Sequence, residues 1–157
     1  MVRLLLISFV IIALPLSASA QKEIEPCKSE IKYENKNQID PRPLSVGRVS
    51  GRMFIEVGKL GGATREIGPV TKACLGLFTE KEHRLVATVV ADDNGRFAFG
   101  TVPAGKYRLV VLAEPLCVAN VALHVTRSSR SKGDKGKQLV IHMRAAGYDT
   151  CSYADYK

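Results

Sequence analysis

The sequence contains no tryptophan, and aromatic residues make up only 6% of its 157 positions. Two motifs that mark common catalytic sites, Gly-x-Ser-x-Gly and His-Glu-x-x-His, are also absent. The acidic residues are scattered through expected loops, so no pair of carboxylates indicates a glycosidase. These absences remove the usual signals of a serine hydrolase, a zinc protease or a glycosidase, and we predict that the chain is not an enzyme.

The sequence lacks the spacing that metal and redox sites need. Zinc knuckles and thioredoxin-type sites use cysteines close together, whereas the four cysteines here are far apart, and the three histidines share no ligand spacing. Asp92-Asp93-Asn94 offers oxygen ligands, but the alternating ligand series that ends in glutamate is missing. We interpret the aspartates as part of a hairpin turn that ends at Gly95. The sequence predicts neither a metal nor a cofactor.

The N-terminus has the layout of a cleaved signal peptide. Arg3 precedes an apolar run from Leu4 to Leu16, and Ser17-Ala18-Ser19-Ala20 supplies the small residues of a cleavage site before Gln21. The alternative is a membrane anchor, but a spanning helix needs about 20 apolar residues and this run is shorter. No later segment is apolar enough to span a bilayer. We therefore expect a secreted or periplasmic protein whose mature chain keeps 137 of the 157 residues after loss of the first 20.

The mature chain is basic, and one segment concentrates the charge. Without Arg3 it holds 22 Lys and Arg against 15 Asp and Glu, a net charge of +7. A Gly/Ser-rich stretch, 126–138, has no apolar residue, and we expect a mobile loop there. Its basic residues form a candidate polyanion-binding site, against the alternative of a merely solvated loop: Arg127, Arg130, Lys132, Lys135 and Lys137. Aromatic residues do not interrupt them, so specific nucleic-acid binding by base stacking is not expected.

Hydropathy alternates with period two through residues 46–143, which is typical of half-buried strands. We expect a polar N-terminal arm over 21–45, a loop over 58–69 and a C-terminal tail over 144–157. Strands are expected over 46–57, 70–79, 85–89, 96–99, 107–111, 121–125 and 139–143. Seven short strands, each with one apolar face, predict an all-β sandwich of two sheets. The expected core is Ala73, Leu75, Leu77, Leu85, Phe97, Phe99, Tyr107, Leu109, Val111, Leu123 and Ile141.

An even number of cysteines after a signal peptide predicts two disulfides, and four cysteines allow three pairings. We favour Cys27–Cys151, because one bond would tie down both tails. The second bond would then be Cys74–Cys117. Cys74 alternates with inward-facing neighbours and should lie on the outer face of its strand, where the chain near Cys117 is expected to cross.

Four segments in order resemble the carboxypeptidase regulatory-like domain: Gly47–Gly51, Gly68–Leu77, Asp92–Phe99 and Val102–Leu109. The resemblance covers about residues 46–143 and implies a transthyretin-like (prealbumin-like) Greek-key sandwich. Lys72 replaces the usual glycine, and the insert at 58–67 is longer than usual. The family's domains are non-catalytic accessories beside peptidases, in outer-membrane receptors and in surface proteins.

Three functions remain open. The first is an exported non-catalytic module that binds or supports a protein or polysaccharide at the cell surface, with an anionic partner favoured by the charge. The second is a carbohydrate-binding module, suggested by a related sandwich but weakened by the lack of tryptophan. The third is an enzyme of unrecognised type, built from residues that converge from distant strands. Three tyrosines of the tail either form a recognition surface or pack on the sandwich: Tyr148, Tyr153 and Tyr156.

Overall fold

Ten β-strands form the secondary structure of the computed structural model, which describes residues 27–33, 39–58, 64–127, 138–145 and 152–156. The strands are β1 (Ile39–Val46), β2 (Ser50–Gly58), β3 (Thr64–Pro69), β4 (Cys74–Thr79), β5 (Leu85–Val90), β6 (Arg96–Ala98), β7 (Gly105–Leu112), β8 (Ala119–Val125), β9 (Leu139–Met143) and β10 (Tyr153–Tyr156). Within those ranges no helix occurs, and so none is long and apolar enough to cross a membrane.

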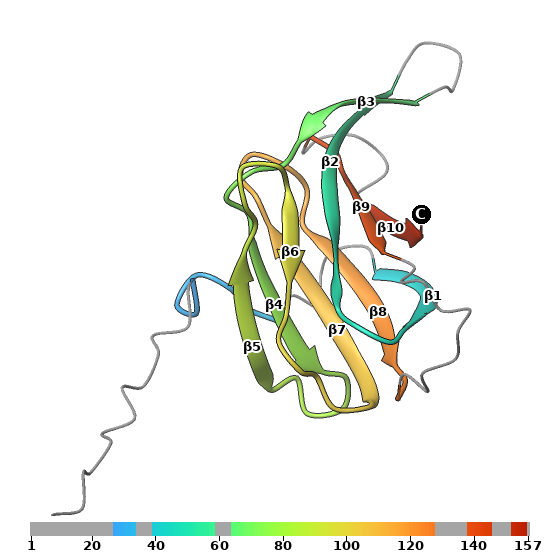
Figure 1. The fold of residues 1–157 in the computed structure, drawn as a ribbon. Coiled ribbons are helices and arrows are strands. Elements are labelled where there is room, and N and C mark those ends of the chain that lie inside the picture. The colour runs from blue at the N-terminus through green and yellow to red at the C-terminus, as the bar shows by residue number, and fades with distance from the viewer. Residues whose placement is uncertain (1–26, 34–38, 59–63, 128–137, 146–151, 157) are drawn as a thin grey trace, which may run out of the picture.

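The strands form two mixed sheets of five strands that lie against each other (Figure 1). The first sheet has the order β1-β8-β7-β4-β5. The second has the order β10-β9-β2-β3, and the short β6 also pairs with β2. Two pairs are parallel, β1 with β8 and β2 with β9, and the remaining pairs are antiparallel. The result is an all-β, sandwich-like fold.

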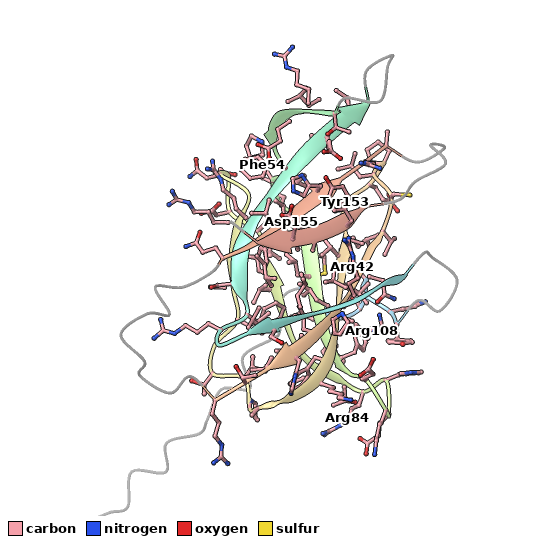
Figure 2. All side chains as sticks on the ribbon, turned by 90° about the vertical axis from the view of Figure 1, so that its right-hand side faces the viewer. Arg42, Phe54, Arg84, Arg108, Tyr153 and Asp155 are labelled. Carbon is pink, nitrogen blue, oxygen red and sulfur yellow. A yellow bond between two sulfur atoms is a disulfide. The ribbon has the colours of Figure 1, made fainter. Side chains whose placement is uncertain are left out.

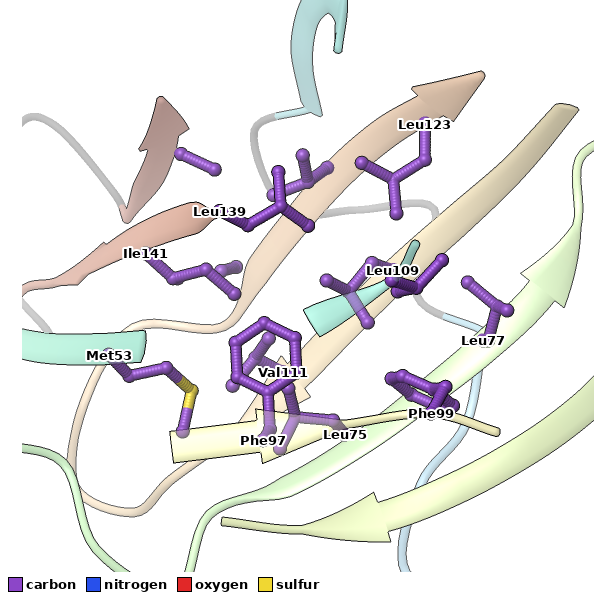
Figure 3. Packing of buried hydrophobic residues seen from close by; sticks show 14 of the residues in the cluster. Met53, Leu75, Leu77, Phe97, Phe99, Leu109, Val111, Leu123, Leu139 and Ile141 are labelled. Carbon is purple, nitrogen blue, oxygen red and sulfur yellow. The ribbon is translucent and has the colours of Figure 1, made fainter. Parts of the chain in front are cut away.

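The core lies between the two sheets, and both sheets contribute to it (Figure 3). Leu75 and Leu109 enter from the first sheet, while Met53 and Ile141 enter from the second, and all four side chains are fully buried. The period-two prediction of the core is confirmed except at Leu85, which is half-buried. A register shift in the β4–β5 pairing places Leu85 opposite Phe78 on the outer face and lets Val86 pack against the core instead.

The expectation of seven strands is wrong, because three further strands come from the segments interpreted as arm, loop and tail. β1 contains two prolines, Pro41 and Pro43, yet it pairs with β8 because it lies at the edge of its sheet, with a register shift between Asp40 and Leu44. β3 forms a hairpin with β2 whose exposed side chains give no alternation. β10 is only four residues long, too short for a clear period.

Residues 27–33 of the N-terminal arm cover part of the outer face of the first sheet. Ile31 is buried there with Phe78 and Val110, in a second apolar cluster apart from the main core. The Tyr33 ring stacks on the exposed ring of His83, with 3.7 Å between centroids. The expectation that Cys74 faces outward is confirmed, because it belongs to this outer cluster.

The favoured cysteine pairing is wrong. Cys27 forms its disulfide with Cys74, across a Cα–Cα distance of 6.0 Å. Cys27 lies next to Cys74 because apolar residues of the arm, such as Ile31, are buried against the outer face of β4. The pairing with the C-terminal tail had left this burial out of account. Cys117 is also disulfide-bonded. Cys151 lies outside the described residues, but it is the one remaining cysteine in the sequence, so peptide mapping should join it to Cys117.

Gly51 brings β2 close to β9 and should not tolerate a larger residue. A Cβ atom at Gly51 would overlap the backbone carbonyl of Leu139, which cannot move without disturbing the ladder. We expect Gly51→Ala to lower the free energy of unfolding by about 3 kcal/mol, the upper range for overpacking. Gly58→Ala is the control, because a Cβ there meets no atom within 4 Å. Denaturant titration of both variants tests this; equal stability would contradict it.

Candidate functional site

Of the five basic residues of the candidate polyanion-binding loop, only Arg127 lies in the described part of the chain. Arg127 is exposed just after β8, whereas Arg130, Lys132, Lys135 and Lys137 lie outside the described residues, as does most of the loop expected to be mobile. Gln138, which follows Lys137 in the sequence, lines a surface groove of about 600 Å³. The groove lies where β2, β6 and the ends of β5 and β9 meet.

Two arginines on neighbouring strands line this groove, which we call the Arg52–Arg96 groove. The antiparallel register of β2 and β6 places Arg52 directly opposite Arg96, and both line the groove. Their neighbours Met53 and Phe97 are buried in the core, so alternation directs both arginine side chains outward. Like charges on directly opposite residues destabilise a sheet. An anion between the two guanidinium groups would remove that cost.

The β5–β6 turn holds Arg52 in place. The Arg52 Nε donates a hydrogen bond to the Asn94 carbonyl oxygen at 3.0 Å, and its guanidinium lies 4.9 Å from the Phe54 ring centroid. These contacts fix the stem of the side chain and one edge of the guanidinium. The two terminal nitrogens of Arg52 take no part in its Nε hydrogen bond to Asn94. Such a pair of N–H groups can bind both oxygens of a carboxylate or sulfate group.

Asp92 also lines the groove, but it mainly serves the turn. Its Oδ1 accepts the backbone N–H groups of Asn94 and Arg96, each at 2.8 Å, and Gly95 has a positive φ of 69°. The predicted hairpin turn is therefore confirmed. The backbone hydrogen bond from Arg96, followed by that from Asn94 and the nearby arginine charges, holds the pKa of Asp92 below its usual value against a smaller opposing effect of burial. The carboxylate stays charged and partly offsets the positive groove.

A buried polar cluster lies further along the outer face of the second sheet, centred on Glu56. The Glu56 side chain is only 4% exposed. Arg144 donates to its Oε2 from Nε at 2.9 Å and from the terminal Nη2 at 2.7 Å, and the Tyr153 hydroxyl donates to Oε1 at 3.1 Å. Figure 2 shows Tyr153 beside Asp155 on this side of the molecule. The pairing of β2 with β3 has a register shift between Ile55 and Glu56, where β2 enters this cluster.

Two pKa values reflect this cluster. Burial raises the pKa of Glu56, but hydrogen bonds from Thr64, Arg144 and Tyr153, with the charge of Arg144, outweigh burial and hold it below its usual value. Burial, followed by the hydrogen bond to Glu56 and its charge, raises the pKa of Tyr153. Of the three tail tyrosines, Tyr153 therefore packs on the sheet. Tyr148 and the side chain of Tyr156 lie outside the described residues.

The histidines do not meet. His124 is exposed on β8, as expected, but the interpretation of His142 as a surface residue is wrong, because β10 covers it on β9. β8 and β9 belong to different sheets. Among the described residues, no group of three or more His, Cys, Asp or Glu side chains is placed to hold a metal ion.

A second depression, of about 750 Å³, lies at the base of the β2–β3 hairpin. Its apolar wall includes Ile55, Val70 and Leu112, and its rim includes Lys72 and Glu114. Sequence reasoning missed this cleft and the Arg52–Arg96 groove, because each joins residues far apart in the chain. For the groove, the only signal in the sequence was an arginine at an outward position of each expected strand.

Comparisons with known proteins give no identification, since no family model, no curated protein and no solved structure matches the chain.

Proposed function

We propose that this chain is an exported, non-catalytic binding module that holds acidic groups of a cell-surface partner in the Arg52–Arg96 groove. The observation that carries the proposal is the pair of arginines placed opposite each other on β2 and β6. A protein that keeps a like-charge pair at a cost to stability is expected to use it. The sequence next to the groove adds positive charge, since Lys135 and Lys137 shortly precede Gln138 in the chain.

Family and fold type form part of the same proposal. We infer a carboxypeptidase regulatory-like domain with a prealbumin-like Greek-key sandwich. In support, the four resembling segments fall on the start of β2, on β3–β4, on the β5–β6 turn and on β7. The chain also leaves the first sheet after β5, pairs β6 with β2, and returns as β7 beside β4. That excursion resembles a Greek-key connection.

The expected partner is an anionic polysaccharide. Carboxylate or sulfate groups at regular spacing fit a fork of arginines and a run of further cations. Nucleic acid is a poorer fit, because among the described residues that line the groove the only aromatic one, Phe97, is buried in the core, which leaves no platform for a base. A neutral glycan would gain nothing from the paired charges.

Exchange of both arginines for glutamine, Arg52→Gln with Arg96→Gln, should weaken binding of a sulfated dextran at least about 10-fold, since two charge-assisted contacts are lost. The salt dependence of binding should also become shallower. Stability without ligand should change little, because relief of the like-charge pair is opposed by loss of the Arg52–Asn94 hydrogen bond and of the attraction of both arginines to Asp92. Calorimetric titration and denaturant unfolding on the same samples measure these effects.

The matched control removes the same charge elsewhere. Arg65→Gln with Arg84→Gln changes two exposed arginines outside the groove and should leave affinity almost unchanged. Equal losses in both double variants would indicate only general charge attraction and would contradict the site. Saturable binding of a neutral glycan, unaffected by Arg52 and Arg96, would favour the carbohydrate-binding alternative. N-terminal sequencing of the protein from cells should begin at Gln21 if it is exported by cleavage.

A further inference from the structure

The last strand, β10, needs side-chain contacts to stay on the sheet. It has four residues, pairs with β9 alone, and ends the second sheet. Ala154 enters the core, while Tyr153 and Asp155 lie on the outer face beside β9. So short an edge strand gains little from its backbone ladder, and it is expected to open more easily than the core strands.

His142 on β9 is the outer-face residue that β10 covers most directly. Its ring stacks on that of Tyr153 at a centroid distance of 4.6 Å and an interplanar angle of 9°. Its Nε2 lies 3.3 Å from Oδ1 of Asp155, and its Nδ1 lies 3.8 Å from Oε1 of Glu56. The imidazole therefore sits between a carboxylate on β10 and a carboxylate on β2, with its side chain 10% exposed.

The surroundings of His142 are acidic on balance. Glu56 of β2 and Asp155 of β10 face it, and Arg144, which follows the end of β9, directs two nitrogens to Glu56. One strand further, β3 places Glu66 opposite Glu56. On the other side, Arg52 pairs with Val140 across β2 and β9 and leans on Phe54, the neighbour of His142. The charge of Arg144 balances that of Glu56. The charge of Asp155 is then available to pair with a protonated His142.

We propose that His142 is a pH-sensitive latch that holds the C-terminal strand β10 on the sheet when its imidazole is protonated. The protonated ring has an N–H on both nitrogens, so it attracts Asp155 and Glu56 together. The neutral ring has one N–H. When this N–H points to Asp155, the lone pair of Nδ1 faces the Glu56 carboxylate, and Nδ1 has no hydrogen-bond partner among the described residues. Docking of β10 is therefore expected to be stronger when the imidazole carries its second proton, that is, at lower pH.

Amide hydrogen exchange on β10 tests the latch, read at the amide of Ala154 or Asp155 that donates to β9, because successive N–H groups of a strand point to opposite edges and β10 pairs with β9 alone. After correction for the intrinsic effect of pH on exchange, protection of this amide should be about five-fold greater at pH 5.5 than at pH 8, a modest change because Asp155 is half exposed. His142→Gln keeps a polar side chain that cannot titrate, and its protection should become independent of pH. Core amides such as that of Leu109 should show no such pH effect in either protein.

Two further variants keep the test decisive. Asp155→Asn lies at a half-exposed position that is not expected to affect folding, and it should reduce the pH effect even if His142→Gln folds poorly. His83→Gln and His124→Gln change exposed histidines and should retain the full effect. The latch is refuted if wild-type protection does not change with pH, or if the change survives in both His142→Gln and Asp155→Asn.

Discussion

Joint replacement of Cys27 and Cys74 by alanine is expected to lower the free energy of unfolding by about 4 kcal/mol, since the bond closes a loop with a sequence separation of 47. Loss of this cross-link enlarges the conformational freedom of the unfolded chain. It also releases the arm from the outer face of β4, where Ile31 and Phe78 are buried together. Denaturant unfolding measures the first effect, and amide exchange at Glu30 and Ile31, whose N–H groups donate to the Cys27 carbonyl oxygen, measures the second.

The control for this prediction is joint replacement of Cys117 and Cys151 by alanine. It removes the other two cysteines and should also lower stability, but it leaves Cys27–Cys74 intact and the arm protected. If both double variants protect the arm equally, the Cys27–Cys74 bond does not hold it. Peptide mapping without reduction should recover Cys27 linked to Cys74, and a peptide that joins Cys27 to Cys117 or Cys151 would contradict the assignment.

The second large effect is expected at the buried ion pair. Arg144→Met should lower the free energy of unfolding by about 3 kcal/mol at pH 7, because the Glu56 carboxylate, only 4% exposed, loses its cation. Glu56→Gln combined with Arg144→Met should recover much of this loss, since the remaining amide carries no charge. If the single and double variants are equally unstable, packing and not charge explains the effect.

The pH dependence provides a separate check on Arg144. In the wild type, the pKa of Glu56 is held below its usual value of 4.5, so this group contributes stability above that pH and loses it on further acidification. Without Arg144, one hydrogen bond and the neighbouring charge no longer lower the pKa of Glu56, while burial, the largest single cause, still raises it. The pKa of Glu56 should therefore be higher than in the wild type, so Arg144→Met should lose less stability than the wild type as the pH falls from 7 through 4.5. Unfolding curves at several pH values compare the two slopes.

Alternation of hydropathy was sufficient to predict β4 and β7, because each has one face in the core. The pairings of β7 with β4 and with β8 also have no register shift. Alternation failed at Leu85, where a register shift moves the side chain to the opposite face. It also failed at β1 and β10, which are ordered by pairing with β8 and β9 and carry no alternation of their own that is clear in the sequence. An edge strand can form on a partner without a strong pattern of its own.

The candidate functional regions show the same limit of sequence reasoning. The basic segment around Lys132 is visible as composition, whereas the opposition of Arg52 and Arg96 depends on the β2–β6 register. In the sequence, nothing distinguishes Glu56 from the other residues of its alternating strand. Only the convergence of β2, β9 and β10 gave it Arg144 and Tyr153 as partners.

The sequence by itself determined the all-β class, the strands of the core, the Asp92–Gly95 turn and the outward face of Cys74, because each follows from local alternation or turn chemistry. The tertiary structure alone decided which cysteine Cys27 meets, how the arm and β10 cover the sheets, and which charges face each other. The physical reason is that these contacts join segments distant in the chain. Their partners are selected by strand register and by the burial of apolar surface, which neighbouring residues in the sequence do not encode.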